Sequence, residues 1–265
     1  MDWGVVMNVL YISGETSSRS AMETLRSFSD LFAKGGIDWR IVLPFYRSLP
    51  GEVTDSAVLL SHFEINIAWR KQYCELYKSE FGGLCCYLID NPYYFNRVES
   101  LGYFDDSERF AFFSKAVSEV LPSLDFEPDI LHCDSWQTAL VPFYLTLKPG
   151  FCANIKMLLS VFESADGGEF AYETLEDVIG ASAYDRVLID CKGNVNYYKG
   201  GLLLSDLVLV KFPETQDYLV RLWATDPCSR ELDEAKRKKA LGKVRLWDVR
   251  TQDLTDFYKE LFDRL

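Results

Sequence analysis

Apolar runs and amphipathic stretches alternate along the amino-terminal part of the chain. The run VVMNVLYIS, residues 5–13, is rich in β-branched side chains and predicts a buried strand. Residues 17–34 carry apolar side chains at helical spacing and end at Gly35-Gly36, a pair typical of a helix C-terminus. A second strand is predicted at 38–43. This strand–helix–strand order is typical of the start of a Rossmann-like parallel sheet.

A polar–apolar alternation follows over residues 57–81. It predicts two antiparallel strands joined by a polar turn near Arg70. The pair Gly82-Gly83 then leads into LCCYLID, another buried strand. His62 lies in the first of the two antiparallel strands, and the sequence offers it no nucleophile–base partner. We therefore expect His62 to pack or pair across the sheet rather than to act in catalysis.

The stretch at 90–145 combines a turn, a long amphipathic helix, a short buried strand and a second helix. Asp105 followed by Glu108 predicts a capping box at the start of the first helix. The short apolar run after that helix ends in polar residues that include Asp134 and Ser135. This pattern predicts a parallel strand whose carboxyl end opens into a site, with one of these two residues capping the next helix.

The carboxyl-terminal part has a weaker pattern. Residues 207–210 predict the last strand of the sheet. We divide the chain into a lobe at 1–225, a charged linker at 226–240 and an amphipathic helix at 241–265. The apolar face of that helix can pack back on the lobe or bind a partner, and both interpretations stay open. The face consists of Leu254, Phe257, Tyr258, Leu261 and Leu265.

Composition limits the function classes. Of the 265 residues, 48% are hydrophobic and 15% aromatic, which is enough for a packed core. The net charge of −12 argues against nucleic acid and against anionic membrane surfaces, whereas an uncharged polymer such as a glucan is unaffected by it. No apolar run has membrane-spanning length, and the N-terminus lacks the pattern of a signal peptide. We therefore predict a cytoplasmic protein.

The seven cysteines form no CxxC pair and no cluster with histidine. An odd count without an export signal predicts reduced, mostly buried thiols. We expect no metal site, because the usual ligand spacing is missing, and the sequence implies no cofactor.

Four segments carry a family resemblance. They are DNPYYF at 90–95, GYFDDSERFAFFSKA at 102–116, PDILHCDSWQTALVP at 128–142 and VNYYKGGLLLSD at 195–206. Together they resemble the N-terminal lobe of bacterial glycogen synthases and plant starch synthases, which are retaining glucosyltransferases with a two-lobe GT-B fold. The resemblance implies an α/β fold, a single Rossmann-like domain with a mostly parallel sheet.

The positions that would hold the donor phosphates depart from the family. Its loop after the first strand carries a Lys-x-Gly-Gly signature, and the aligned residues are Ser17, Ser18, Arg19 and Ser20. The glycines that let a backbone approach a phosphate are therefore missing. Arg19 remains as a phosphate ligand or as a solvated surface residue. Lys199 opens a helical Lys-Gly-Gly pattern, either as a second phosphate ligand or as part of a packed helix end.

Two further catalytic positions are substituted. The strand predicted at 157–161 ends in the family in a motif whose histidine reaches the transferred sugar, and here Phe162 replaces that histidine. The family aspartate before the tryptophan is Ser135, and an acid stands one place earlier as Asp134. A shift by one residue redirects the side chain, so Asp134 is not assumed to substitute. In the alternative interpretation, Asp134 and Ser135 cap a helix while Trp136 packs.

A set of aromatic and amide side chains is suited to stacking on sugar rings and to hydrogen bonding with them. The alternative interpretation is an Asn-Pro turn whose aromatic rings anchor it to the core. The predicted substrate-binding set consists of Asn91, Tyr93, Tyr94, Trp136 and Gln137.

These observations favour a catalytically reduced relative of glycogen and starch synthases, a pseudoenzyme in α-glucan metabolism. We expect it to bind an α-glucan or malto-oligosaccharide, or a partner protein. A second hypothesis is the N-terminal half of a split ADP-glucose-dependent α-1,4-glucosyltransferase, completed by a separate C-terminal lobe on another chain. A third is a structural subunit that binds a partner. Activity of the isolated chain is not expected, because the second lobe is missing from the sequence and each lost charge stabiliser slows the reaction by orders of magnitude.

Overall fold

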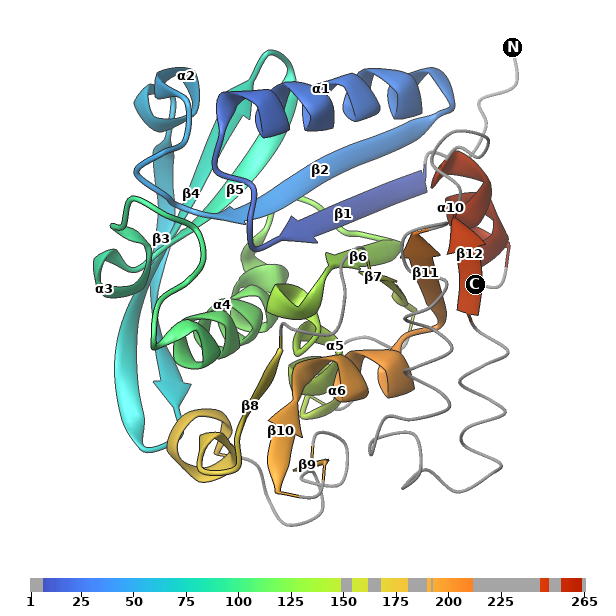
Figure 1. Ribbon diagram of the computed structural model, residues 1–265. Coiled ribbons are helices and arrows are strands. Elements are labelled where there is room, and N and C mark those ends of the chain that lie inside the picture. Colours follow the sequence, from blue (N-terminus) through green and yellow to red (C-terminus); the bar gives the residue numbers. More distant parts are fainter. Residues whose placement is uncertain are drawn as a thin grey trace.

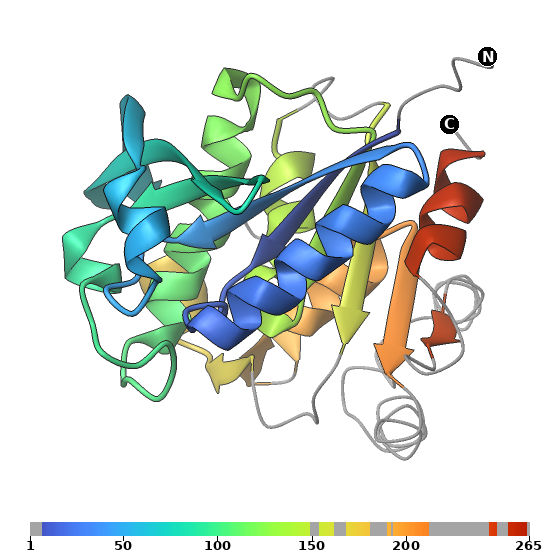
Figure 2. The same ribbon diagram turned by 90° about the horizontal axis from the view of Figure 1, so that it is seen from above.

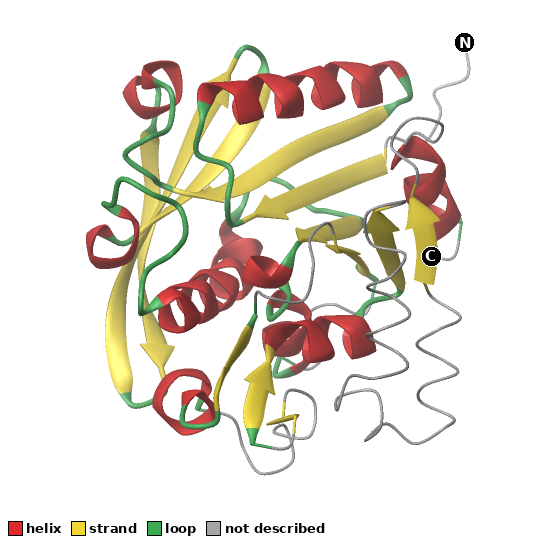
Figure 3. Ribbon diagram, in the orientation of Figure 1, coloured by secondary structure: helices red, strands yellow, loops and turns green. Residues whose placement is uncertain are grey.

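The computed structural model describes residues 7–148, 154–161, 168–180, 190–191, 193–211, 244–247 and 254–263. These residues form a twisted nine-stranded sheet with helices on both faces (Figure 1). Figure 3 shows the helices in red on either side of the yellow strands. The expected α/β class with a mostly parallel sheet is confirmed.

The large sheet has the order β12-β11-β7-β6-β1-β2-β5-β4-β3. Neighbouring strands from β12 to β5 are parallel, and β4 runs antiparallel to both β5 and β3. The strands are β1 Met7–Ser13, β2 Ile37–Pro44, β3 Val58–Ile67, β4 Arg70–Phe81, β5 Leu84–Asp90, β6 Ile130–Asp134, β7 Lys156–Val161, β11 Leu207–Lys211 and β12 Val244–Trp247.

The helices form a layer on each face of this sheet. α1 and α10 cover one face, and α4, α5 and α6 cover the other (Figures 1 and 2). The α-helices are α1 Arg19–Lys34, α2 Gly51–Asp55, α3 Pro92–Phe95, α4 Asp106–Val120, α5 Val141–Thr146, α6 Tyr197–Leu204 and α10 Leu254–Phe262. Three single turns are η1 Leu121–Ser123, η2 Trp136–Thr138 and η3 Leu175–Ile179. A small antiparallel sheet has the order β8-β10-β9, with β8 Glu169–Ala171, β9 Asp190–Cys191 and β10 Asn194–Asn196.

The boundaries of α1 follow from its end residues. The Ser18 side chain accepts a hydrogen bond from the Ala21 N–H at 3.2 Å, which satisfies one of the free donors of the first turn. At the other end Gly35 caps the helix and Gly36 has φ +79°, a conformation that suits glycine. The helix and its stop at Gly35-Gly36 are therefore confirmed.

The capping box expected at the start of α4 is wrong. Asp105 occupies the N-cap position, but its side chain forms no capping hydrogen bond and instead pairs with Arg97 at 2.5 Å. Glu108 accepts hydrogen bonds from the Tyr94 hydroxyl at 2.5 Å and from Arg70 at 2.9 Å. Both carboxylates thus connect α4 to neighbouring segments, because a charged tertiary partner forms a stronger bond than a backbone N–H.

The carboxyl-terminal part differs from the expected division. β11 is not the last strand, because Val244–Trp247 forms β12 within the stretch expected to be helical. The helix begins only at Leu254. Its apolar face packs back on the lobe, with Leu254, Tyr258 and Leu261 buried. The proposed linker at 226–240 lies outside the described residues.

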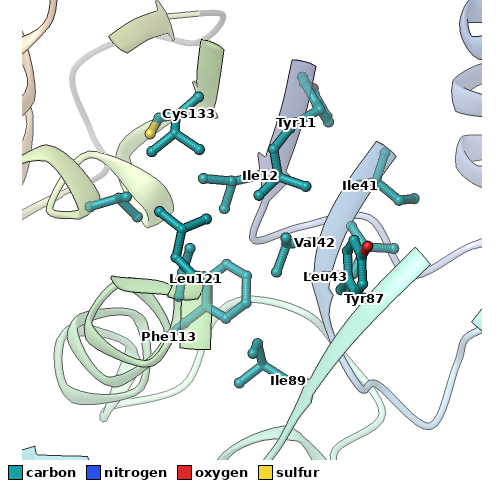
Figure 4. Close-up of a cluster of buried hydrophobic side chains, with 14 of the residues drawn as sticks. Tyr11, Ile12, Ile41, Val42, Leu43, Tyr87, Ile89, Phe113, Leu121 and Cys133 are labelled. Atoms are coloured by element: carbon teal, nitrogen blue, oxygen red, sulfur yellow. The ribbon is translucent and has the colours of Figure 1, made fainter. Parts of the chain in front are cut away.

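The core lies on both sides of the parallel strands. Figure 4 shows Ile12, Val42 and Ile89 from three neighbouring strands on the side of the sheet that faces Phe113 of α4. All four side chains are almost fully buried, so this layer fixes the sheet against α4. On the opposite face, Tyr11 packs against residues that contact α1 and α10.

Candidate functional site

The strand order reverses beside β1. The chain adds β2 and β5 on one side of β1, then returns to add β6, β7, β11 and β12 on the other side. In open parallel sheets, ligands bind at such a reversal, outside the carboxyl ends of the strands. The segment at 13–16 after β1 and the segment at 134–137 after β6 meet at this point, where β1 and β6 pair as far as Ser13 and Asp134.

The segment after β1 is tied closely to the segment after β6. The Ser13 hydroxyl lies 3.1 Å from the Thr16 hydroxyl and donates to Asp134 Oδ2 at 3.5 Å. The Tyr46 hydroxyl donates to the Gly14 carbonyl at 2.5 Å. A Cβ atom at Gly14 would lie 2.4 Å from the Gln137 Cβ, so only glycine permits this approach. The segment at 13–16 is therefore held in place by hydrogen bonds and packing within the protein.

Ser135 has a strained backbone. Its φ of 63° and ψ of −174° lie in a region that is occupied almost only by glycine, and such a residue costs about 1–3 kcal/mol. The Ser135 hydroxyl lies 3.1 Å from the Tyr198 hydroxyl of α6. Strain of this kind concentrates at functional sites, and here it occurs directly before Trp136, where the resemblance implies an aspartate.

The helix cap expected at Asp134 or Ser135 is wrong. Ser135 forms no capping hydrogen bond, and the turn that follows is the short 3-10 helix η2. The Asp134 backbone carbonyl accepts from the Thr138 hydroxyl at 2.8 Å. The Asp134 carboxylate faces Tyr11, whose pKa is raised well above its usual value by burial and then by the charge of Asp134 and a hydrogen bond to it. The Asp134 carboxylate therefore already has partners within the protein.

Trp136 and Gln137 have different environments. Trp136 is half-buried, and its ring packs edge-on against two phenylalanine rings. The ring centroids lie 5.0 Å apart for Phe110 and 5.5 Å apart for Phe170. Gln137 is fully buried, and its amide donates to Glu15. Of this pair, only Trp136 keeps part of its surface exposed.

The segment at 90–95 divides between core and surface. The Asn91 side chain is buried, where it accepts from the Tyr93 N–H at 2.9 Å and donates to the Tyr73 carbonyl at 2.7 Å. Tyr94 is fully buried. Tyr93, by contrast, is 62% exposed. Asn91 and Tyr94 thus match the interpretation as a turn anchored to the core, and Tyr93 alone presents its ring to solvent.

Both predicted phosphate ligands already have partners. Arg19 forms an exposed ion pair with Glu52 at 3.3 Å. Lys199 is buried, and its Nζ donates to the Asp190 carbonyl. A Cβ atom at Gly201 would lie 2.9 Å from the Ala139 carbonyl oxygen, as expected for a packed helix end. The Ser17 side chain forms no hydrogen bond with the residues that the structure describes, and Phe162 lies outside them.

Sequence reasoning missed the tyrosines of this site. Tyr11 and Tyr198 approach Asp134 and Ser135 from the middle of β1 and from α6. The consecutive tyrosines of VNYYKGG were the available signal for Tyr198, but the pattern alone does not tell which ring turns toward the site. The strain at Ser135 has no signal in the sequence.

The structure also bears on the cysteines, on metal binding and on membrane-spanning helices. Cys74, Cys85, Cys86 and Cys133 are free thiols, and burial raises the pKa of Cys74 to about 12. In the described part of the chain, no group of three or more His, Cys, Asp or Glu side chains is arranged to hold a metal ion. None of the helices formed by these residues is both long enough and apolar enough to cross a membrane.

The parallel sheet, its reversal beside β1 and the layers of helices define the Rossmann-like lobe of a GT-B glycosyltransferase. Residues 23–217 match the family model described as the starch synthase catalytic domain, and the chain belongs to this family. The resemblance stated from the sequence is thereby confirmed.

Curated relatives agree with this family. The glycogen synthase of Bacillus cereus (strain B4264) is 36% identical over 216 residues, which cover 78% of this chain and 45% of the relative. The glycogen synthase of Lactobacillus acidophilus is 35% identical over 196 residues, with 72% of this chain and 41% of the relative covered. The chain thus spans less than half the length of the curated relatives it matches.

A solved structure shares the fold. The catalytic domain of starch synthase IV from Arabidopsis thaliana, bound to ADP and acarbose, superposes with a TM-score of 0.75 and 20% identity. The match covers 92% of this chain and 51% of that chain.

Proposed function

We propose that this lobe is a catalytically reduced member of its family that binds an α-glucan. The proposal rests on a contrast between two sets of residues, the predicted phosphate ligands with their neighbours and the aromatic residues of the predicted substrate-binding set. Ser18, Arg19 and Lys199 are each bonded to other groups of the chain. Tyr93, by contrast, is largely exposed, and Trp136 is half-buried. Aromatic faces bind the apolar faces of sugar rings.

The residues predicted to hold the donor phosphates support the loss of catalysis. Arg19 is paired with Glu52, Ser18 caps α1, and the Lys199 ammonium is bonded to a backbone carbonyl. A phosphate would have to displace these partners. Removing one pre-positioned group that stabilises developing charge costs about 10²–10³-fold in rate. Three substituted positions, Ser17, Ser135 and Phe162, therefore remove most of the rate enhancement.

The affinity for glucan is expected to be weak. A ligand on one open wall keeps much of its hydration, and little binding energy remains after the cost of association. We expect a dissociation constant near 1 mM, roughly −4 kcal/mol.

The binding proposal is tested by titrating the full chain with maltoheptaose and following amide shifts by NMR. We expect shifts at Tyr93 and Trp136 that weaken severalfold in Tyr93→Ala. Tyr172→Ala is the matched control, because Tyr172 is an exposed tyrosine on a different segment. An absence of shifts at tens of millimolar sugar, or shifts unchanged in Tyr93→Ala, would overturn the proposal.

Catalysis is tested with ADP-glucose and glycogen. We expect no transfer of glucose by the chain alone. Turnover near the enzyme median of about 10 per second would contradict the proposal. Transfer that begins only when a separate C-terminal lobe is added would instead support the split glucosyltransferase.

A further inference from the structure

A pocket of about 300 Å³ lies at the carboxyl ends of β2 and β5, and no residue of the segments at 13–16 and 134–137 lines it. Three segments form its wall. They are Phe45, Tyr46 and Arg47 after β2, Thr54 of α2, and Asp90, Pro92 and Asn96 around α3. Its volume is at the lower end of the range for small-molecule sites, which suits a ligand of one or two rings.

The Asp90 carboxylate has no partner in this pocket. Asp90 lies opposite Glu75 in the antiparallel pair of β4 and β5. Glu75 accepts from the Tyr73 hydroxyl at 2.6 Å and from the Tyr77 hydroxyl at 2.7 Å. Within the described ranges, no hydrogen bond or ion pair reaches the Asp90 side chain. Asp90 is thus a partly buried acceptor without donors.

The environment of the Asp90 carboxylate favours the binding of hydrogen-bond donors. Burial, followed by the charge of Glu75, raises the pKa of Asp90 to about 6. A carboxylate that has lost water and gained no replacement is stabilised when a ligand supplies hydroxyl or N–H groups. The hydroxyls of Tyr73 and Tyr77 are already directed to Glu75, so these two nearby donors are not available to Asp90.

The other polar groups of the pocket determine the charge of the ligand. Arg47 is exposed and, among the residues that the structure describes, has no ion pair with Asp90 or any other carboxylate. A cationic ligand would meet the Arg47 charge, and an anionic ligand would meet the charges of Asp90 and Glu75. A neutral ligand with several hydroxyls can donate to Asp90 and accept from Arg47 and from the Asn96 amide. Phe45 adds an apolar wall.

We propose that this pocket binds a neutral polyhydroxyl compound the size of one sugar ring. Its ligand contacts differ from those of the glucan contact proposed above, because neither Tyr93 nor Trp136 lines the pocket. Pro92 and Asn96 lie four positions apart around α3, so the same short helix can serve both sites with different residues.

The test is an NMR titration of the full chain with D-glucose, maltoheptaose, methylammonium and acetate. We expect glucose to shift the amides of Phe45, Thr54 and Asn96, with at least tenfold weaker binding in Asp90→Asn. Asp55→Asn is the matched control, because Asp55 is an exposed carboxylate of α2 that does not line the pocket. Arg47→Ala is expected to weaken the binding of glucose as well. This result would separate a ligand contact from a local effect of the change at Asp90.

Each arm of the experiment decides a different point. Maltoheptaose shifting these amides as strongly as glucose assigns the site to a glucan end, and a weaker response assigns it to a free sugar. Methylammonium or acetate binding in place of glucose, or glucose shifts that persist in Asp90→Asn, would overturn the proposal, as would no shift at 100 mM glucose. Tyr93→Ala leaves the glucose response intact, so failure here is distinct from failure of the glucan proposal.

Discussion

His132 is fully buried in the middle of the sheet, and both of its ring nitrogens are hydrogen-bonded. Nδ1 lies 2.7 Å from the Tyr258 hydroxyl and Nε2 lies 2.5 Å from the Ser160 hydroxyl. The Trp39 indole N–H can only donate, and it donates to the Tyr258 hydroxyl at 3.3 Å. A hydroxyl can donate one hydrogen bond and accept two, so the Tyr258 and Ser160 hydroxyls can pair with either neutral tautomer of His132. His132 is thus held between two hydroxyls, and burial keeps it neutral.

This neutral state makes the protein sensitive to acid. Burial lowers the pKa of His132 to about 3, so the folded chain resists a proton that the unfolded chain accepts below about pH 6.5. The stabilisation is fully present above about pH 6.5 and is lost as the pH falls toward about 3, by about 1.4 kcal/mol per pH unit. Urea unfolding between about pH 7.5 and 5 should show this slope in the wild type and not in His132→Gln.

The chain provides a matched control for this prediction. Its second histidine, His62, is exposed on β3. His62→Gln should keep the slope of the wild type. Equal slopes in His132→Gln and the wild type would mean that other groups cause the acid sensitivity.

The strain at Ser135 gives a second prediction at this scale. Ordinarily a glycine variant is less stable than the alanine variant at the same position, by about 0.5–1 kcal/mol. At Ser135 both variants lose the hydroxyl beside Tyr198, but only glycine relieves the φ of 63°. We therefore expect Ser135→Gly to be more stable than Ser135→Ala by about 1 kcal/mol in urea unfolding. The usual order of the two variants would exclude strain at this residue.

At the scale of elements, the Tyr258 hydroxyl links α10 to two strands of the sheet by hydrogen bonds. Tyr258→Phe removes that hydroxyl and leaves the buried Trp39 N–H and His132 Nδ1 without it. We expect a loss of about 1–3 kcal/mol in the free energy of unfolding, because unsatisfied buried groups are costly. Lys259→Ala, at an exposed position of the same helix, should change stability by less than about 0.5 kcal/mol. A Tyr258→Phe variant as stable as the control would contradict this function of α10.

Most elements could be predicted because their patterns are local. The runs at β1 and β5 and the helical spacing of α1 depend on periods of two and 3.6 residues, which the sequence displays directly. The capping box at Asp105 failed because Arg97, which binds that carboxylate, reaches it through the tertiary fold. β12 failed because a four-residue edge strand carries too little pattern to be recognised.

The candidate site was predicted less completely than the fold. Its position at the end of β6 follows from the polar residues after a buried strand. Which side chains are available does not follow, because Tyr93 and Tyr94 are adjacent in sequence yet one is exposed and the other is buried. Such a difference depends on Glu108, which lies on another helix and binds the Tyr94 hydroxyl.

At the scale of the whole molecule, charge opposes the association of copies. β3 is an edge strand of the large sheet and exposes Val58, Leu59 and Leu60. Exposed apolar edge strands promote pairing between chains, whereas a net charge of −12 repels a second copy. Salt weakens only the repulsion, since the screening length falls from about 10 Å at 0.1 M to about 3 Å at 1 M.

We therefore expect a monomer by light scattering at low salt and weak self-association at high salt. Leu59→Lys should abolish the association, because it places a charge on the edge. Glu23→Gln makes the same change of one unit in net charge at an exposed residue of α1, away from β3, and should leave the association intact if the edge and not the net charge decides. A tight oligomer at low salt would show that repulsion does not govern the assembly.

The hydroxyl of Tyr258 also has a consequence for synthesis. Its partners Trp39 and His132 precede it by 219 and 126 positions, and they belong to strands at the centre of the sheet. A ribosome that has made β1, β2 and β6 has not yet made the group that satisfies them. At about 5–20 residues per second, the nascent centre of this sheet waits several seconds for Tyr258. During that interval water takes the place of the Tyr258 hydroxyl at the Trp39 N–H and at His132 Nδ1.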